Sequence, residues 1–146
     1  ATTNGTATLL AADPGRPVLV GAITNFSALL ERAREEATDK RELTVLCAGK
    51  ERMFALEDAY VAGRVVQALL PNGKRKHVEL NDAAIAALEL VRYYGNRWRR
   101  AILASAHARE LKALGYRDDV ESVTEVDAYD IVPEYSDRLI KVPDST

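Results

Sequence analysis

The sequence predicts an α/β domain with a mostly parallel sheet and a helix-rich second half. Two short apolar runs, residues 18–23 and 43–47, are bounded by turn-forming residues, and each is followed by a segment with helical periodicity. Strands that alternate with helices usually pair in parallel and are buried on both faces, so they read as continuous apolar runs. From residue 81 to residue 115, by contrast, the pattern is that of consecutive helices.

The composition predicts one ordinary domain. Of 146 residues, 47% are hydrophobic and 29% are charged, which suits a single core. With 20 basic and 22 acidic residues the net charge is −2, so we expect neither nucleic acid nor a membrane surface as a partner. A single cysteine and the lack of a signal-like or membrane-length apolar segment predict a cytoplasmic protein. We expect Cys47 to be buried at the end of a strand.

The stretch of residues 43–66 carries the main candidate site. Its apolar run ends at Gly49, where glycine allows the backbone to turn sharply. From about residue 55 to residue 70, apolar residues recur at the spacing of one helix face. Glu57 and Asp58 are therefore expected in the first turn of a helix that follows a strand, at the sheet edge where open α/β sheets bind their ligands.

Two interpretations fit these adjacent carboxylates. They lie about 100° apart around the helix, so one can face a cleft while the other braces it, or both can share a hard cation such as Mg²⁺. Acidic residues also stabilise helix N-termini through the helix dipole, without any further role. Spacing alone favours the second, purely structural interpretation.

Two further places could bind a ligand. Residues 2–6, T-T-N-G-T, combine glycine with neutral donors suited to phosphate or sulfonate oxygens, although a plain turn or helix cap uses the same residues. Asn25 stands where the first apolar run meets the next helix, and it either caps that helix or contacts a ligand. The candidate ligand-binding residues of the first stretch are Thr3, Asn4, Gly5 and Thr6.

The second half supplies helices and a terminal hairpin. Asn81 is expected to cap a helix that runs to residue 94, and two short helices follow at 98–104 and 106–114. His107 lies in the first turn of the last of these and is expected to be a surface or packed residue. The basic loop 72–77 and the acidic stretch 118–130 are interpreted as solvated segments. Short strands at 131–133 and 138–142 are expected to pair around a turn at 135–137.

Five short motifs occur together in one order. They are T-T-N-G-T at 2–6, C-A-G at 47–49, L-E-D at 56–58 followed by A-G at 62–63, S-x-H at 105–107, and D-V at 119–120. None of them is specific alone, but in this order and spacing they resemble the landmarks of the 2-phosphosulfolactate phosphatase family. The resemblance covers nearly the whole chain.

The resemblance implies a three-layer α/β/α fold and a Mg²⁺-dependent phosphatase. The implied reaction hydrolyses 2-phospho-3-sulfolactate to 3-sulfolactate and phosphate, on the way to coenzyme M. It also implies that a further N-terminal portion, carrying site residues, precedes Ala1. By the same resemblance Glu57 and Asp58 are catalytic and hold the metal, and Thr3, Asn4, Gly5, Thr6 and Gly49 bind the small phosphorylated and sulfonated acid. Two residues are added to this set by their chemistry: Asn25 could reach the acid from the neighbouring strand end, and Arg52 could supply a cation.

Two positions depart from the family pattern, and they leave alternatives open. Arg52 stands where the family usually has glycine, and Ala7 where it commonly has arginine. The loss of one cation at position 7 and the gain of another at position 52 either adapts the anion pocket to a different phosphoester or has no effect. The nucleophile is either a water molecule or a carboxylate. Alternative functions are a phosphatase of the same fold for another small phosphorylated acid, and a non-catalytic anion-binding or structural module. The apolar helices could also form a homodimer surface.

Overall fold

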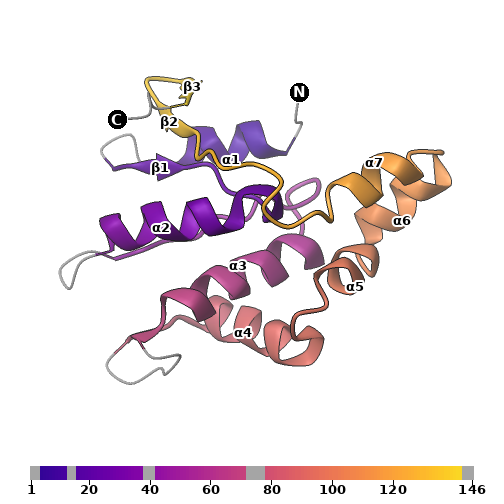
Figure 1. Cartoon of the computed structure of the whole chain (residues 1–146), viewed down its shortest axis with the longest axis horizontal. Helices are drawn as coiled ribbons and strands as arrows, with labels where there is room; N and C mark the ends of the chain where they lie inside the picture. Colours follow the sequence, from indigo (N-terminus) through magenta and orange to yellow (C-terminus); the bar gives the residue numbers. More distant parts are fainter. Residues whose placement is uncertain (1–3, 13–15, 38–41, 72–77, 143–146) are drawn as a thin grey trace.

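The structure, a computed structural model, describes residues 4–12, 16–37, 42–71 and 78–142, and these are mostly helical (Figure 1). No helix in these ranges is long and apolar enough to cross a membrane. In chain order the elements are α1 (Gly5–Ala11), β1 (Val18–Leu19), the 3-10 helix η1 (Ile23–Asn25), α2 (Phe26–Glu36), α3 (Leu56–Leu69), α4 (Asp82–Tyr94), α5 (Trp98–Leu103), α6 (Ala106–Ala113), α7 (Arg117–Ser122), β2 (Glu134–Ser136) and β3 (Leu139–Lys141).

The sheet is small and antiparallel, so the predicted three-layer α/β/α fold with a mostly parallel sheet is wrong. Its order is β1-β2-β3, and both pairings are antiparallel. Val18 lies opposite Tyr135, and Tyr135 lies opposite Ile140. The first apolar run thus pairs with a hairpin from the far end of the chain. Local periodicity predicts that a segment is extended, but it does not say which distant segment it will pair with or in which direction.

The second apolar run does not form the expected buried strand. Residues 42–48 have no strand partner within the described parts of the chain. Leu43 is 45% exposed and Leu46 is 52% exposed, and Cys47 is exposed as well. Both the predicted parallel strand and the predicted burial of Cys47 are therefore wrong. An apolar run is buried only where another element covers it, and this requirement is not visible in the run itself.

Helix α3 is the centre of the larger apolar core. Tyr60 is 0% exposed and packs with Val91 and Tyr94 of α4 and with Ala101 of α5. Its hydroxyl donates a hydrogen bond to the carbonyl oxygen of Gly95 at 2.7 Å. The buried phenol is thus satisfied, as a buried polar group requires.

A second apolar cluster joins α3 to α2. Phe26 and Leu30 of α2 pack against Val65 of α3. The Trp98 ring at the start of α5 contacts both clusters, with centroid distances of 4.9 Å to Phe26 and 5.3 Å to Tyr60. Figure 1 shows the result, in which α3 lies between α2 and α4. The core therefore fixes the position of α3, whose first turn carries the two candidate carboxylates.

Most helices agree with their predicted ranges, and their caps explain where they begin. The Asn81 side chain accepts from the Ala84 N–H at 2.9 Å, and Ser105 Oγ accepts from the Ala108 N–H at 3.1 Å. The helix predicted from about residue 55 to residue 70 is α3. Helix α7 was not predicted, because its segment reads as an acidic, solvated stretch. It is held by Val120, which is 2% exposed.

The predicted C-terminal hairpin is confirmed, with its first strand displaced by three residues. The strands are β2 and β3, and the turn residues between them, Asp137 and Arg138, have φ angles of 52° and 62°. The basic loop 72–77, which the sequence predicts to be solvated, lies outside the described residues.

Candidate functional site

The first turn of α3 is tied to the loop that precedes it. Glu57 and Asp58 lie in this turn, as predicted. The Gly49 N–H donates a hydrogen bond to Asp58 Oδ2 at 2.7 Å. Gly49 has a φ of 68°, and a Cβ atom there would lie 2.6 Å from the carbonyl oxygen of Met53. Only glycine fits without strain, so the C-A-G motif places a backbone donor against the Asp58 carboxylate.

The same loop contains a tight two-residue turn. Lys50 and Met53 exchange backbone hydrogen bonds of 3.1 and 2.8 Å. Between them, Glu51 and Arg52 have φ angles of 51° and 65°. Two successive left-handed residues make this a type I′ turn, which favours Asn-Gly and is strained with larger side chains. Position 52 is thus one at which glycine, the residue expected there from the resemblance, would relieve strain.

The T-T-N-G-T stretch meets this loop through one side chain. Asn4 Oδ1 accepts from the Glu51 N–H at 3.2 Å. Gly5 and Thr6 belong to the first turn of α1, and Asn4 directly precedes it, so the described part of this stretch is the start of a helix. Thr6 also lines a shallow pocket of about 170 Å³ between α1 and the β2–β3 hairpin. Thr3 lies outside the described residues.

Helix α6 adds a histidine to the carboxylates. His107 Nδ1 lies 3.5 Å from Glu57 Oε1, an ion-pair distance when the imidazole is protonated. Ser105, which is 1% exposed, caps α6 and so fixes the helix turn that carries His107. The sequence predicted only a surface or packed role for this residue. The S-x-H motif was a signal, but nothing local showed that it would face residue 57.

The electrostatics of the site centre on Asp58. Desolvation raises the pKa of this carboxyl group above its ordinary value, and the neighbouring Glu57 charge adds to the increase. The Gly49 N–H and a positive charge on His107 act in the opposite direction, but the net shift of the Asp58 pKa is upward. Desolvation and the Glu57 charge thus disfavour the ionised form of Asp58 by more than its present partners favour it. A cation bound beside Asp58 would favour the ionised form.

Cys47 is an unsuitable nucleophile, although it lies two residues before Gly49. Partial desolvation of the sulfur raises the pKa of Cys47, and the negative charge of Asp58 raises it further. The thiol therefore stays protonated near neutral pH, whereas thiol catalysis requires the thiolate.

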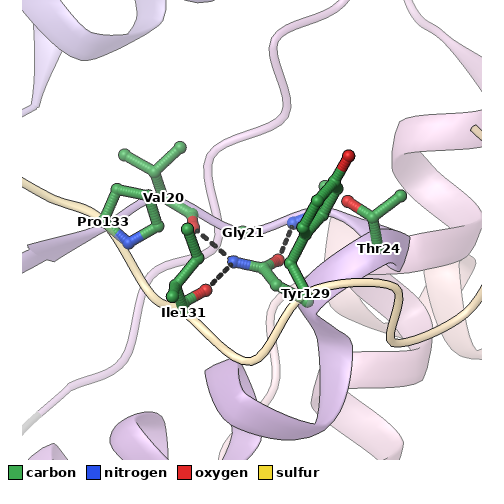
Figure 2. A pocket seen from close by; sticks show the side chains of 8 residues that line it. Val20, Gly21, Thr24, Tyr129, Ile131 and Pro133 are labelled. Atoms are coloured by element: carbon green, nitrogen blue, oxygen red, sulfur yellow. Dashed lines mark hydrogen bonds between the residues drawn. The ribbon is translucent and has the colours of Figure 1, made fainter. Parts of the chain in front are cut away.

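The hydrogen bonds of the Asn25 side chain go to backbone groups outside this cluster, and they stabilise the fold. Asn25 Nδ2 donates to the carbonyl oxygens of Val20 at 3.2 Å and Ile131 at 2.9 Å, and its Oδ1 accepts from the Ala22 N–H at 2.8 Å (Figure 2). It stands before α2 but makes no side-chain cap there, so the predicted capping role is wrong. With its amide used in this way, Asn25 is 6% exposed and ties the chain end to the N-terminal half.

The pocket beside Asn25 does not offer phosphate chemistry. It has a volume of about 210 Å³ and is lined by backbone and by largely apolar side chains. Figure 2 shows Thr24 and Tyr129 at its edge and Val20, Ile131 and Pro133 around it. Its lining contains no carboxylate and no cation. We therefore place the candidate chemistry at the start of α3.

Four of the five motifs thus converge on one place. Asn4 contacts the loop of residues 49–53, this loop contacts Asp58, and His107 contacts Glu57. The family model described as 2-phosphosulpholactate phosphatase matches residues 1–138 of the chain. The chain belongs to this family. Four of the five motifs that carried the resemblance lie around a pair of carboxylates in this chain.

Relatives within the 2-phosphosulfolactate phosphatase family agree with this assignment. A probable 2-phosphosulfolactate phosphatase of Thermus thermophilus is 37% identical over 139 residues, which are 94% of this chain and 56% of the relative. That of Caldanaerobacter subterraneus is 29% identical over 140 residues, covering 96% and 56%. That of Carboxydothermus hydrogenoformans is 32% identical over 132 residues, covering 90% and 52%. The chain spans slightly more than half the length of these relatives.

The residues at the start of α3 fit a magnesium ion only in part. The described residues contain no group of three or more His, Cys, Asp or Glu side chains able to hold a metal ion. Mg²⁺, however, commonly takes one or two carboxylates and completes its shell with water and substrate phosphate. Glu57 and Asp58 provide such a pair, and the raised pKa of Asp58 marks a carboxylate that a cation would stabilise.

Proposed function

We propose that this chain forms part of a Mg²⁺-dependent phosphatase that hydrolyses 2-phospho-3-sulfolactate to 3-sulfolactate and phosphate. Membership of the family supports the reaction class. The observation that carries the choice of site is the convergence of Glu57, Asp58, His107 and the Gly49 loop, described above. The substrate is a small, doubly anionic acid, and carboxylates that face it require a cation between them.

In this proposal the two carboxylates have one task, to hold the metal. When bound, Mg²⁺ neutralises charge on the phosphoryl oxygens, which is the main need of phosphoryl transfer. The Gly49 N–H orients the Asp58 carboxylate by donating to one of its oxygens. His107 approaches Glu57 from α6, at an ion-pair distance of 3.5 Å, and would restrict the Glu57 side chain when protonated. Both contacts prepare the pair before substrate arrives.

The chain's neutral donors have the second task, to bind the anionic ends of the substrate. Asn4 touches the loop beside the carboxylates, and this contact supports a role for the T-T-N-G-T motif in binding the same ligand. Thr3, Gly5 and Thr6 belong to this proposed set, together with Arg52, whose side chain is exposed on the loop. Neutral donors bind phosphate and sulfonate oxygens without competing with the metal for charge. Asn25 is not retained, because its amide is used within the fold.

The test is phosphate release by the purified protein. Turnover of 2-phospho-3-sulfolactate is expected with magnesium and not with a chelator, and Glu57→Gln or Asp58→Asn should lower kcat/KM by about two orders of magnitude or more. Glu121→Gln is a matched control, because Glu121 is an ion-paired carboxylate between α5 and α7. Equal activity in the Glu57 and Glu121 variants would contradict the proposed site. No release by the wild-type protein with magnesium would contradict the reaction.

A second candidate, a phosphatase for another small phosphorylated acid, is favoured by Arg52. Arg52 is exposed on the loop beside Asp58, at a position where the resemblance leads us to expect glycine. Comparing kcat/KM for 2-phospho-3-sulfolactate and for a phosphorylated lactate without the sulfonate would decide between the two. A higher value for the carboxylate-only substrate, lost in Arg52→Gly, would favour this alternative.

A further inference from the structure

One face of α6 makes two polar contacts with the site. His107 and Glu110 are three residues apart and therefore lie on the same side of the helix. His107 Nδ1 lies 3.5 Å from Glu57 Oε1, and Glu110 forms an ion pair with Lys50. In Figure 1, α6 lies with α7 at one end of the molecule. Helix α6 packs on α5 and α7, so these polar side chains are its described links to the loop and to α3.

The position of Lys50 affects the backbone segment that donates a hydrogen bond to Asp58. Lys50 follows Gly49, whose N–H donates to Asp58 Oδ2, and it is the first residue of the type I′ turn. This turn carries the strained residues Glu51 and Arg52, so its geometry needs support from outside the loop. Asn4 gives one support, as described above. The Lys50–Glu110 pair gives another, and the Lys50 side chain is 28% exposed.

We propose that Lys50 and Glu110 are positioning residues, whose ion pair holds the loop so that the Gly49 N–H stays on the Asp58 carboxylate. Through this pair and through His107, α6 then sets the orientation of both carboxylates. The inference rests on the proposed function in one respect, that Asp58 and Glu57 are the metal-holding groups. Neither Lys50 nor Glu110 itself touches substrate in this proposal. A surface ion pair without this role would leave Gly49 and the metal affinity unaffected.

A charge-swap series tests the proposal on the metal-free chain. The variants are Lys50→Glu, Glu110→Lys and the double exchange, and the readout is the exchange rate of the Gly49 amide measured by NMR. We expect each single variant to speed this exchange by about tenfold, and the double variant to return it to near the wild-type rate. Glu35→Lys, which breaks the Arg32–Glu35 pair within α2, away from α6, is the matched control and should leave Gly49 unchanged. Lys50→Met and Glu110→Gln serve as neutral variants if a charge reversal prevents folding.

Binding of Mn²⁺ as a probe metal, measured by electron paramagnetic resonance, gives a second readout. If Lys50 and Glu110 act as positioning residues, both single variants should bind Mn²⁺ about tenfold more weakly, and the double variant should recover the wild-type affinity. A direct effect of charge would instead tighten binding in Lys50→Glu and weaken it in Glu110→Lys, because only the first adds negative charge near the cation.

The outcomes separate this inference from the proposed function. Unchanged Gly49 exchange in both single variants, or opposite shifts in Mn²⁺ affinity without recovery in the double variant, would overturn the positioning role. If the wild-type chain bound no Mn²⁺ while Gly49 exchange still followed the charge-swap pattern, the metal-binding proposal would fail and the structural link from α6 to Asp58 would stand.

Discussion

Arg52 shows how a single residue can carry strain beside a candidate site. Its φ of 65° lies in the left-handed region, where side chains with a Cβ cost about 1 kcal/mol or more. Arg52→Gly is therefore expected to raise the free energy of unfolding by about 0.5–1 kcal/mol, after allowance for the greater freedom of glycine in the unfolded chain. Urea denaturation measures this change.

A control separates the turn from the general effect of glycine. Arg92→Gly changes an exposed arginine in the last turn of α4, where it should cost about 1 kcal/mol. Opposite signs for the two substitutions are the expected result. A loss of stability in Arg52→Gly would show that the guanidinium group makes stabilising contacts that outweigh the backbone strain.

Asp58 makes a pH-dependent contribution to stability. Desolvation raises the pKa of Asp58 above its ordinary 3.8, so the native state binds this proton more tightly than the unfolded chain does. The group's stabilising contribution is then complete below about pH 3.8 and is lost as the pH rises through the native pKa. Asp58→Asn, which keeps an acceptor for the Gly49 N–H, is thus expected to be more stable than wild type at neutral pH.

Unfolding of both proteins in urea with a chelator, at several pH values from about 3 to 7, measures this effect. The stability advantage of Asp58→Asn should grow with pH. An advantage that is largest in acid would mean that the hydrogen bond from Gly49, rather than desolvation, dominates the Asp58 pKa.

At the residue scale the sequence identified the carboxylates but not their neighbours. Glu57 and Asp58 lie in the predicted first turn of a helix, because helix periodicity and the preceding glycine are local signals. The approach of His107 to Glu57 spans about fifty positions in the chain, and no local pattern encodes it. Asn25 shows the reverse error, since a residue expected to cap a helix has its amide bound to the carbonyl oxygens of the nearby Val20 and the distant Ile131.

Among the elements, α3 and α4 pack so closely that one position admits only glycine. A Cβ added at Gly63 would lie 2.3 Å from the carbonyl oxygen of Ala87. Gly63→Ala should therefore lower the free energy of unfolding by about 2–3 kcal/mol, although alanine is the better helix former by about 1 kcal/mol. Thermal or urea denaturation measures this loss.

The control for this prediction is a substitution with the same chemistry in an open position. Gly115→Ala places a Cβ where nothing lies within 4 Å, and its cost comes only from a φ of 93°. An unchanged or raised free energy of unfolding in Gly63→Ala would mean that the helices move apart at Gly63 with little cost. The A-G landmark after L-E-D thus has a packing reason that is independent of chemistry.

Most helices and the local C-terminal hairpin were predictable, whereas strand pairing over long distances in the chain was not, for a physical reason. The caps Asn81 and Ser105 and the spacing of apolar residues in α3 and α4 act within a few residues of one another. A strand is completed only by its neighbour, and β1 finds β2 more than a hundred residues away. The apolar run 43–47 has the composition of a strand, but no described segment pairs with it.

For the molecule as a whole, Asn25 links the N-terminal half of the chain to the segment that precedes the C-terminal hairpin. Its side chain bridges the backbone of residues 20 and 22 to Ile131, and it is supported by the pairing of β1 with β2. Nearby, Asp127 holds the start of α2 through the Ser27 N–H at 2.6 Å and the Ser27 hydroxyl at 2.7 Å. These polar contacts fasten the hairpin to the N-terminal half.

Asn25→Ala is therefore expected to loosen the chain end rather than the α3–α4 core. The substitution leaves two carbonyl oxygens and one N–H without their partner, which should cost about 3 kcal/mol. Limited proteolysis should then cut the segment before β2 well before the helices, and amide exchange there should rise while that of α3 stays slow. Asn96→Ala, at an exposed residue bonded to Arg64, is the control and should change neither. Uniform loss of protection across α3 and the hairpin would show instead that the two ends and the core unfold as one unit.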